Sequence, residues 1–164
     1  QLKSNDVPVL LPIKNTNGEY LCKLGTKHVQ VTKFIYGQPF LYDKKQTLSS
    51  GRTLRKFHEV LVGTEELVKP SASIYPTSSV ISECVTKIIN MRDEISPDKV
   101  QQILELYDKI VGKWESRNTE LPNTIIHGDW NQRNQLFSRE GEVSCIMDFD
   151  FLTRAERIFD IAYA

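Results

Sequence analysis

The sequence lacks an excess of either charge, because Lys plus Arg and Asp plus Glu both number 21 among its 164 residues. Without a net field, the composition does not favour binding to nucleic acid or to an anionic membrane. The sequence also lacks a run approaching the ~18 apolar residues of a membrane helix, and its start shows no signal-peptide pattern. We therefore predict a soluble chain that has neither nucleic acid nor membrane as a partner.

Cysteine is also scarce. The three cysteines, Cys22, Cys84 and Cys145, show no metal-type pairing, and their odd number argues against a disulfide framework. We therefore predict a cytoplasmic protein. The length suffices for one domain with a core, and the oligomeric state stays open.

The most informative stretch runs from Ile125 to Asp150. An apolar run ends at His127-Gly128-Asp129, Asn134 follows five positions after the Asp, and a second apolar run ends at Asp148-Phe149-Asp150. Short apolar runs bounded by turn formers are typical of strands, so each carboxylate is expected where a strand passes into a loop. The stretch predicts a β-hairpin with Asn134 and Asp148 at its ends.

The spacing of these residues fits phosphoryl transfer from a nucleotide. That reaction needs an Asp that accepts the proton of the attacking hydroxyl, an amide oxygen that helps to hold Mg²⁺, and a further Asp that bridges the metal to the phosphates. The gap from Asp129 to Asn134 equals the D-x-x-x-x-N gap of the protein-kinase catalytic loop. We predict Asp129 as the catalytic base and Asn134 and Asp148 as metal ligands.

Together with Phe159-Asp160-Ile161-Ala162, these motifs resemble the aminoglycoside phosphotransferase and choline kinase family of small-molecule kinases. The resemblance implies a protein-kinase-like α+β fold. Residues 1–36 would form a partial N-lobe sheet and hinge, and residues 37–164 a partial, mostly helical C-lobe. It also implies ATP and Mg²⁺ as cofactors and a small hydroxyl compound as acceptor, such as an aminoglycoside, choline or homoserine. The commonest family pattern has His, Pro and Gly where this chain has Asn131, Gln132 and Arg133.

The resemblance also assigns a nucleotide contact. Residues 31–37 resemble the family's hinge, whose main chain binds adenine, and this implies cofactor binding at Lys33, Phe34 and Ile35 with Thr32 at the gatekeeper position. The alternative for this segment is an ordinary strand end followed by a proline turn.

Three further residues would support the site. His127 would order the catalytic loop, and Asp150 would be a supporting or second-metal carboxylate. Asp160 resembles the Asp that braces this loop, with Arg154 and Arg157 as candidate partners, and the alternative is an ordinary carboxylate at a helix start. Trp130 and Arg133 are expected either to face the acceptor and the γ-phosphate or simply to be exposed on the loop.

Two features of such a kinase have no visible counterpart here: the phosphate-covering glycine loop and the strand lysine that pairs with the phosphates. The last helices of the family's C-lobe are also missing after Ala164, so we expect the chain to be the middle part of a larger kinase. One alternative is a catalytically inactive kinase-like binding module. Another is a phosphatase-like D-x-D-x-x-T motif from Asp148 to Thr153, whose first Asp would be a nucleophile.

Apolar content predicts a strand over 7–13, which Pro8 and Pro12 confine to an edge or an irregular path. Alternation predicts strands over 19–24 and 28–35. Helical periodicity predicts helices over 48–62 and 80–91 and a third that starts with Ser96-Pro97 and runs to Trp114. His58 lies on the apolar stripe of the first helix and is expected to be a structural core residue. Candidates to line an acceptor pocket are the aromatic residues Tyr75, Tyr107 and Trp114, for which core packing is the alternative.

Overall fold

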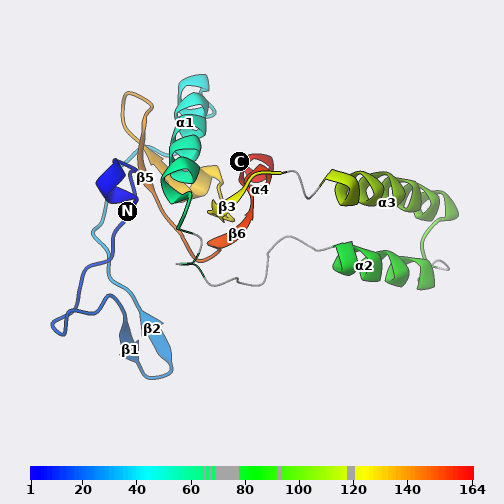
Figure 1. The fold of residues 1–164 in the computed structure, drawn as a ribbon, viewed down its shortest axis with the longest axis horizontal. Coiled ribbons are helices and arrows are strands. Elements are labelled where there is room, and N and C mark those ends of the chain that lie inside the picture. Colours follow the sequence, from blue (N-terminus) through cyan, green and yellow to red (C-terminus); the bar gives the residue numbers. More distant parts are fainter. Residues whose placement is uncertain (65, 67, 69–77, 92–93, 118–120) are drawn as a thin grey trace.

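The computed structural model describes residues 1–64, 66, 68, 78–91, 94–117 and 121–164. The chain combines helices with short antiparallel strands in separate runs, which confirms the predicted α+β class. The elements in chain order (Figure 1) are η1 (Lys3–Asn5), β1 (Cys22–Leu24), β2 (Lys27–Val29), α1 (Lys44–Leu61), α2 (Ser78–Asn90), α3 (Pro97–Arg117), β3 (Asn123–Ile126), η4 (Gln132–Asn134), β4 (Gln135–Phe137), β5 (Val143–Ile146), β6 (Thr153–Glu156) and α4 (Ile158–Tyr163).

The core forms where α1 packs against β3 and β5. Phe57 of α1 is fully buried, and its ring centroid lies 5.7 Å from that of Trp130 and 6.0 Å from that of His127. The apolar core therefore supports the predicted catalytic loop directly. Its buried members are Val7, Leu54, Phe57, Leu61, Ile125, Trp130 and Ile146.

The strand pairing brings two loops together. β3 pairs antiparallel with β6, and β4 pairs antiparallel with β5. Residues 127–134 connect β3 to β4, and residues 147–152 connect β5 to β6. Because both loops join the same two strand pairs, they must run side by side, and the polar residues of both loops gather in one place.

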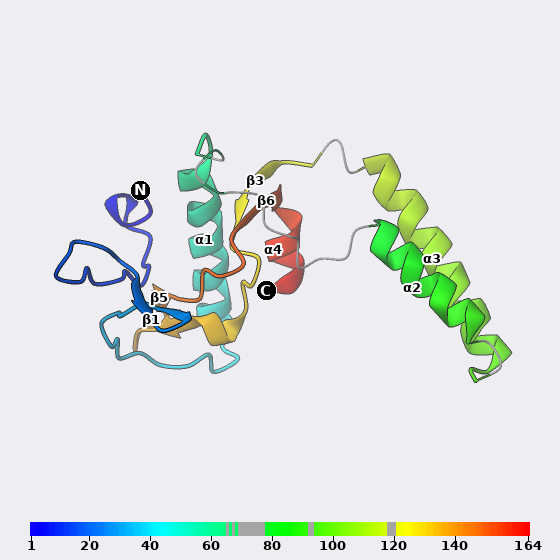
Figure 2. The same ribbon diagram turned by 90° about the horizontal axis from the view of Figure 1, so that it is seen from below.

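The helices follow the predicted ranges closely. α1 begins at Lys44, before the predicted start at residue 48, with the extended residue Asp43 at its N-cap. α2 and α3 pack on each other, and Ser82 Oγ and Tyr107 OH are joined by a 2.5 Å hydrogen bond. Figures 1 and 2 show this pair lying to one side of the other elements. Tyr107 thus has a packing role between the helices, while Tyr75 and the side chain of Trp114 lie outside the described residues.

The N-terminal strand predictions are largely wrong. In place of three strands, the structure has one hairpin of three-residue strands, β1 and β2, whose residues are all exposed. Pro8 and Pro12 have no N–H to donate, so residues 7–13 form only isolated bridges, from Val9 to Ile146 and from Pro12 to Thr32. The lobe boundary between residues 36 and 37 stays a prediction.

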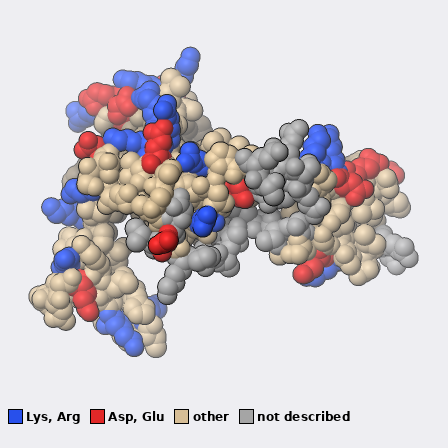
Figure 3. All heavy atoms as spheres, in the orientation of Figure 1, with Lys and Arg blue, Asp and Glu red and all other residues tan. Residues whose placement is uncertain are grey.

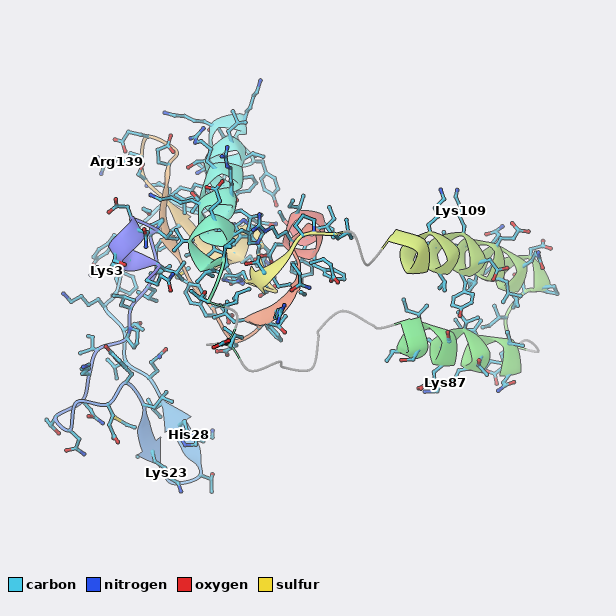
Figure 4. The ribbon with its side chains drawn as sticks, in the orientation of Figure 1. Lys3, Lys23, His28, Lys87, Lys109 and Arg139 are labelled. Atoms are coloured by element: carbon cyan, nitrogen blue, oxygen red, sulfur yellow. The ribbon has the colours of Figure 1, made fainter. Side chains whose placement is uncertain are left out.

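Neither a membrane helix nor a surface of one sign stands out. Among the described residues, every helix is too short or too polar to cross a membrane. On the face drawn in Figure 3, the described basic and acidic side chains are interspersed. Figure 4 places His28 on the β1–β2 hairpin, which projects away from α1 and β3. It places Lys87 and Lys109 on the α2–α3 pair.

Candidate active site

The predicted hairpin is present. β4 and β5 pair with Gln135 opposite Ile146, and the Met147 N–H donates to the Asn134 carbonyl at 2.9 Å. Asn134 immediately precedes β4, and Asp148 follows the residue bonded to Asn134. The hairpin therefore brings the two predicted metal ligands to the same end. Their role as ligands stays a prediction.

The Asp129 carboxylate is held by the amide groups of its own loop. Asn134 Nδ2 donates to Asp129 Oδ2 at 2.6 Å and to the Asp129 carbonyl at 3.0 Å. Asn131 Nδ2 donates to Asp129 Oδ1 at 2.8 Å. Both carboxylate oxygens therefore have a fixed donor. A carboxylate oxygen can accept more than one hydrogen bond, so each oxygen retains capacity for a substrate hydroxyl.

His127 links the two loops. The Asp129 N–H donates to His127 Nδ1 at 3.3 Å, so this nitrogen carries no proton, and Nε2–H donates to the Met147 carbonyl at 3.1 Å. Burial lowers the pKa of His127 below its ordinary value, although the nearby carboxylates of Asp160, Asp129 and Asp148 oppose that shift. With Nδ1 as acceptor and Nε2–H as donor, His127 connects the two loops by hydrogen bonds. Its supporting role in the reaction stays a prediction.

The Asp160 carboxylate is hydrogen-bonded to the loop that follows β3. It is fully buried and accepts from the main-chain N–H groups of His127 and Gly128, each at 2.9 Å, and from His58 Nε2 at 2.8 Å. Neither predicted arginine is hydrogen-bonded to Asp160 in the part of the chain that the structure describes. Arg154 Nε donates to Asn123 at the surface, the buried Arg157 Nε has no hydrogen-bond partner among the described residues, and the side-chain partner of Asp160 is His58 of α1.

Trp130 is buried and is not an exposed side chain of the loop. Its side chain is 1% exposed, packs on Phe57, and donates from Nε1 to Ser50 Oγ at 3.1 Å. The loop turns Trp130 into the core because α1 offers both an apolar surface and a hydroxyl acceptor at that place. Arg133, by contrast, is exposed.

A cavity of about 890 Å³ opens beside the second loop. Its described lining includes Asp148, Asp150 and the predicted gatekeeper Thr32. Asp148 has φ of +61° and is exposed, and its carboxylate accepts no hydrogen bond from any residue that the structure describes. Oxygen ligands such as these suit Mg²⁺, which binds through one or two carboxylates plus substrate phosphates. The residues present therefore fit the metal.

The three residues predicted to contact the nucleotide do not belong to the described lining of this cavity. They are Lys33, Phe34 and Ile35, and the Phe34 side chain is 81% exposed. Their contact with a nucleotide stays a prediction, and so do the supporting roles of Asp150 and the others.

Gly128 is required by both its backbone angle and its surroundings. Its φ is +79°, and a Cβ there would lie 2.3 Å from the Phe151 carbonyl oxygen. Gly18 has a similar φ of +82° but open space around it. We expect Gly18→Ala to cost about 1 kcal/mol, the cost of left-handed backbone, and Gly128→Ala about 3 kcal/mol, because overpacking adds to it. Urea unfolding of both variants measures the difference, and equal losses would contradict the close approach of the two loops.

The sequence reasoning missed two site residues, Asn131 and His58 as a partner of Asp160. Asn131 stands at a position where the resembling family has another residue, and that departure was the available signal. His58 lies 102 positions before Asp160, and no local pattern connects them.

Comparison with known proteins identifies the family and the fold of the chain. A model described as the phosphotransferase enzyme family matches residues 1–164. Solved structures with the same fold include a spectinomycin phosphotransferase bound to ADP and spectinomycin, at 17% identity and a TM-score of 0.67, covering 99% of this chain and 54% of that one. An aminoglycoside phosphotransferase from Alicyclobacillus acidocaldarius has 17% identity and a TM-score of 0.62, with coverage of 98% and 53%.

A third solved structure is an amicoumacin kinase in complex with AMP-PNP and Ca²⁺, at 16% identity and a TM-score of 0.60, covering 99% of this chain and 48% of that one. The chain thus spans about half the length of these proteins. A search of curated protein sequences finds no match. Because the family model matches every residue and the solved structures share the fold, the chain belongs to the phosphotransferase enzyme family and has the protein-kinase-like fold.

Proposed function

We propose that the protein transfers the γ-phosphoryl group of ATP to a hydroxyl of a small molecule. The observation that carries this proposal is the arrangement of Asp129, Asn134 and Asp148. The Asn134 amide donates a hydrogen bond to the Asp129 carboxylate, and the β4–β5 hairpin brings Asp148 to the same end as Asn134. A base and two oxygen ligands in this relation are what phosphoryl transfer requires.

In the proposed reaction, the acceptor hydroxyl oxygen forms a bond to the γ-phosphorus while the bond from that phosphorus to the bridging oxygen of ADP breaks. The hydroxyl proton passes to the Asp129 carboxylate. Asn134 Oδ1 and the Asp148 carboxylate would hold Mg²⁺, which when bound neutralises charge on the phosphates. Positioning and electrostatic stabilisation then account for most of the rate.

ATP as donor is supported by relatives of the same fold whose structures hold ATP, ADP or AMP-PNP. Those relatives bind streptomycin, gentamicin, spectinomycin or amicoumacin. For this protein, an aminoglycoside, choline and homoserine are the acceptor classes to compare. Incubating the full-length protein with ATP, Mg²⁺ and each class, and measuring ADP and phosphorylated product, tests the function. Product from none of them, together with no nucleotide binding, would favour an inactive kinase-like module.

The phosphatase alternative has less support. A nucleophilic Asp of that kind follows a strand in an α/β sheet, whereas β5 belongs to a two-stranded antiparallel pair. The Thr of the motif, Thr153, is buried in β6, where it pairs with Ile126 of β3. A buried strand residue does not present its hydroxyl to a phosphate at the Asp148 loop.

Asp148→Asn is expected to remove the Mg²⁺-dependent part of ATP binding. ATP at a hundredfold excess over its Kd stabilises a protein by about 2.7 kcal/mol, a shift that thermal denaturation detects. With Mg²⁺ present, the variant should lose most of this stabilisation, because its amide is a weaker ligand for the metal than a carboxylate.

Asp108→Asn is the control, because it makes the same charge change at an exposed residue of α3 that has no assigned role in the site. It should retain the Mg²⁺-dependent shift. Asp150→Asn, in the lining of the same cavity, then tests the predicted supporting role of Asp150. An unchanged Asp148→Asn would remove Asp148 from the metal site.

A further inference from the structure

Asn131 makes more contacts with the catalytic loop than its exposed neighbours do. Its Nδ2 donates to Asp129 Oδ1 at 2.8 Å, and its Oδ1 accepts from the Arg133 N–H at 2.8 Å. Its main chain donates to the Asp129 carbonyl at 2.9 Å and accepts from Gln135 Nε2 at 3.2 Å. Every polar group of Asn131 is therefore engaged within the loop.

These contacts determine which way the amide of Asn131 faces. A backbone N–H can only donate, so the atom that meets the Arg133 N–H must be the amide oxygen. The amide nitrogen then has to face Asp129, whose carboxylate can accept. The same reasoning places Asn134 Nδ2 toward the other carboxylate oxygen, because both of its partners on Asp129 are oxygen acceptors.

We propose that Asn131 is a positioning residue for phosphoryl transfer: with Asn134 it clamps the Asp129 carboxylate between two amide groups and prevents it from turning away from the acceptor hydroxyl. This inference rests on the proposed function. The clamp leaves each carboxylate oxygen able to accept from a substrate, and it limits rotation about the last side-chain bond of Asp129. Misplacement of a reacting group by about 1 Å can cost on the order of a hundredfold in rate.

A purely structural role for Asn131 makes a different prediction. Asn131 is also the N-cap of η4. A variant that removes the whole side chain would lose the capping hydrogen bond and the hydrogen bond to Asp129 together. Ser and Asp both retain an oxygen that can cap the helix. Ser lacks a donor that reaches Asp129, and Asp replaces the donor with a second carboxylate. These two variants therefore separate the two roles.

The chain contains a matched control for this pair. Asn15 Oδ1 accepts from the Asn17 N–H at 2.9 Å, and its Nδ2 donates to the Glu19 carboxylate at 3.3 Å. The half-buried Asn15 thus makes the same two kinds of contact as Asn131, a main-chain N–H to its oxygen and its nitrogen to a carboxylate, in a turn to which no role in the site is assigned.

The test is steady-state kinetics of N131S and N131D beside N15S and N15D in the full-length protein. We expect N131S to lower kcat about tenfold and N131D about a hundredfold, with the KM for ATP within about twofold of wild type. The Asn15 variants should keep the wild-type kcat. A wild-type kcat in N131D, or in N131S if N131D does not fold, would overturn the proposal.

A second measurement does not depend on turnover. In amide NMR spectra, the side-chain signal that disappears in N131S should shift in Asp129→Ala and stay in place in the remote variant Asp98→Ala. An unmoved signal in Asp129→Ala would overturn the clamp. If the wild-type protein transfers phosphate to no acceptor, the proposed function fails, and this NMR result alone decides whether Asn131 holds Asp129.

Discussion

Asp129→Asn is expected to lower kcat by about 10²- to 10⁴-fold, the usual contribution of a general base. The amide cannot take the hydroxyl proton. It also presents a donor to Asn131 or Asn134, each of which donates to the carboxylate in the wild type. ATP affinity should change little, because no nucleotide contact is assigned to this side chain. The measurement is turnover with the best acceptor, combined with an ATP titration.

Asp108→Asn is a suitable control, since this exposed residue on α3 undergoes the same chemical change away from the loop. It should retain full turnover. Full turnover in Asp129→Asn would remove Asp129 as the base and with it the proposed mechanism. A parallel loss of ATP binding would instead indicate that the loop had collapsed.

Asp160→Ala is expected to destabilise the protein by at least about 3 kcal/mol, because a buried donor left without a partner costs about 1–3 kcal/mol. The substitution leaves the main-chain N–H groups of His127 and Gly128 and the ring N–H of His58 without their acceptor. Asp160→Asn retains one oxygen and should lose less. Urea unfolding gives the free energy for each variant.

Glu59→Ala provides the control, because Glu59 lies next to His58 on α1 and, among the residues that the structure describes, its carboxylate pairs with the exposed Arg55 alone. Its effect should be within about 0.5 kcal/mol, as for other exposed residues. A small loss in Asp160→Ala would contradict the bracing role. A double-mutant cycle with His58→Ala should show strong coupling, since both side chains belong to one hydrogen-bond network.

The loops of the site were accessible to sequence reasoning because their signals are local. The stretch from Ile125 to Asp150 contains two apolar segments, each followed by polar turn-forming residues, with one turn between them. Antiparallel strands joined by a short turn pair with each other, as β4 and β5 do. The helices were likewise evident from their apolar periodicity, although α1 starts earlier than its first apolar residue suggested.

The N-terminal strands were not accessible in the same way. The apolar content of residues 7–13 and the alternation in residues 28–35 reflect a tendency to be extended, but a strand forms only where a partner offers a complete set of donors and acceptors. With Pro8 and Pro12 in the first segment and exposed residues in β1 and β2, only a short hairpin and isolated bridges result.

The resemblance of the sequence to a known family was sufficient to predict the fold class. The hairpin that carries Asn134 and Asp148 was predictable as well, since it depends on spacing within one short segment. Which side chains hold that arrangement was decided by the tertiary structure. His58 reaches Asp160 across 102 positions, Trp130 turns inward because Phe57 and Ser50 receive it, and Asn131 meets Asp129 because its oxygen is already bonded to Arg133. These contacts depend on which polar groups still need a hydrogen-bond partner once the core is packed. A local sequence pattern contains no information about that.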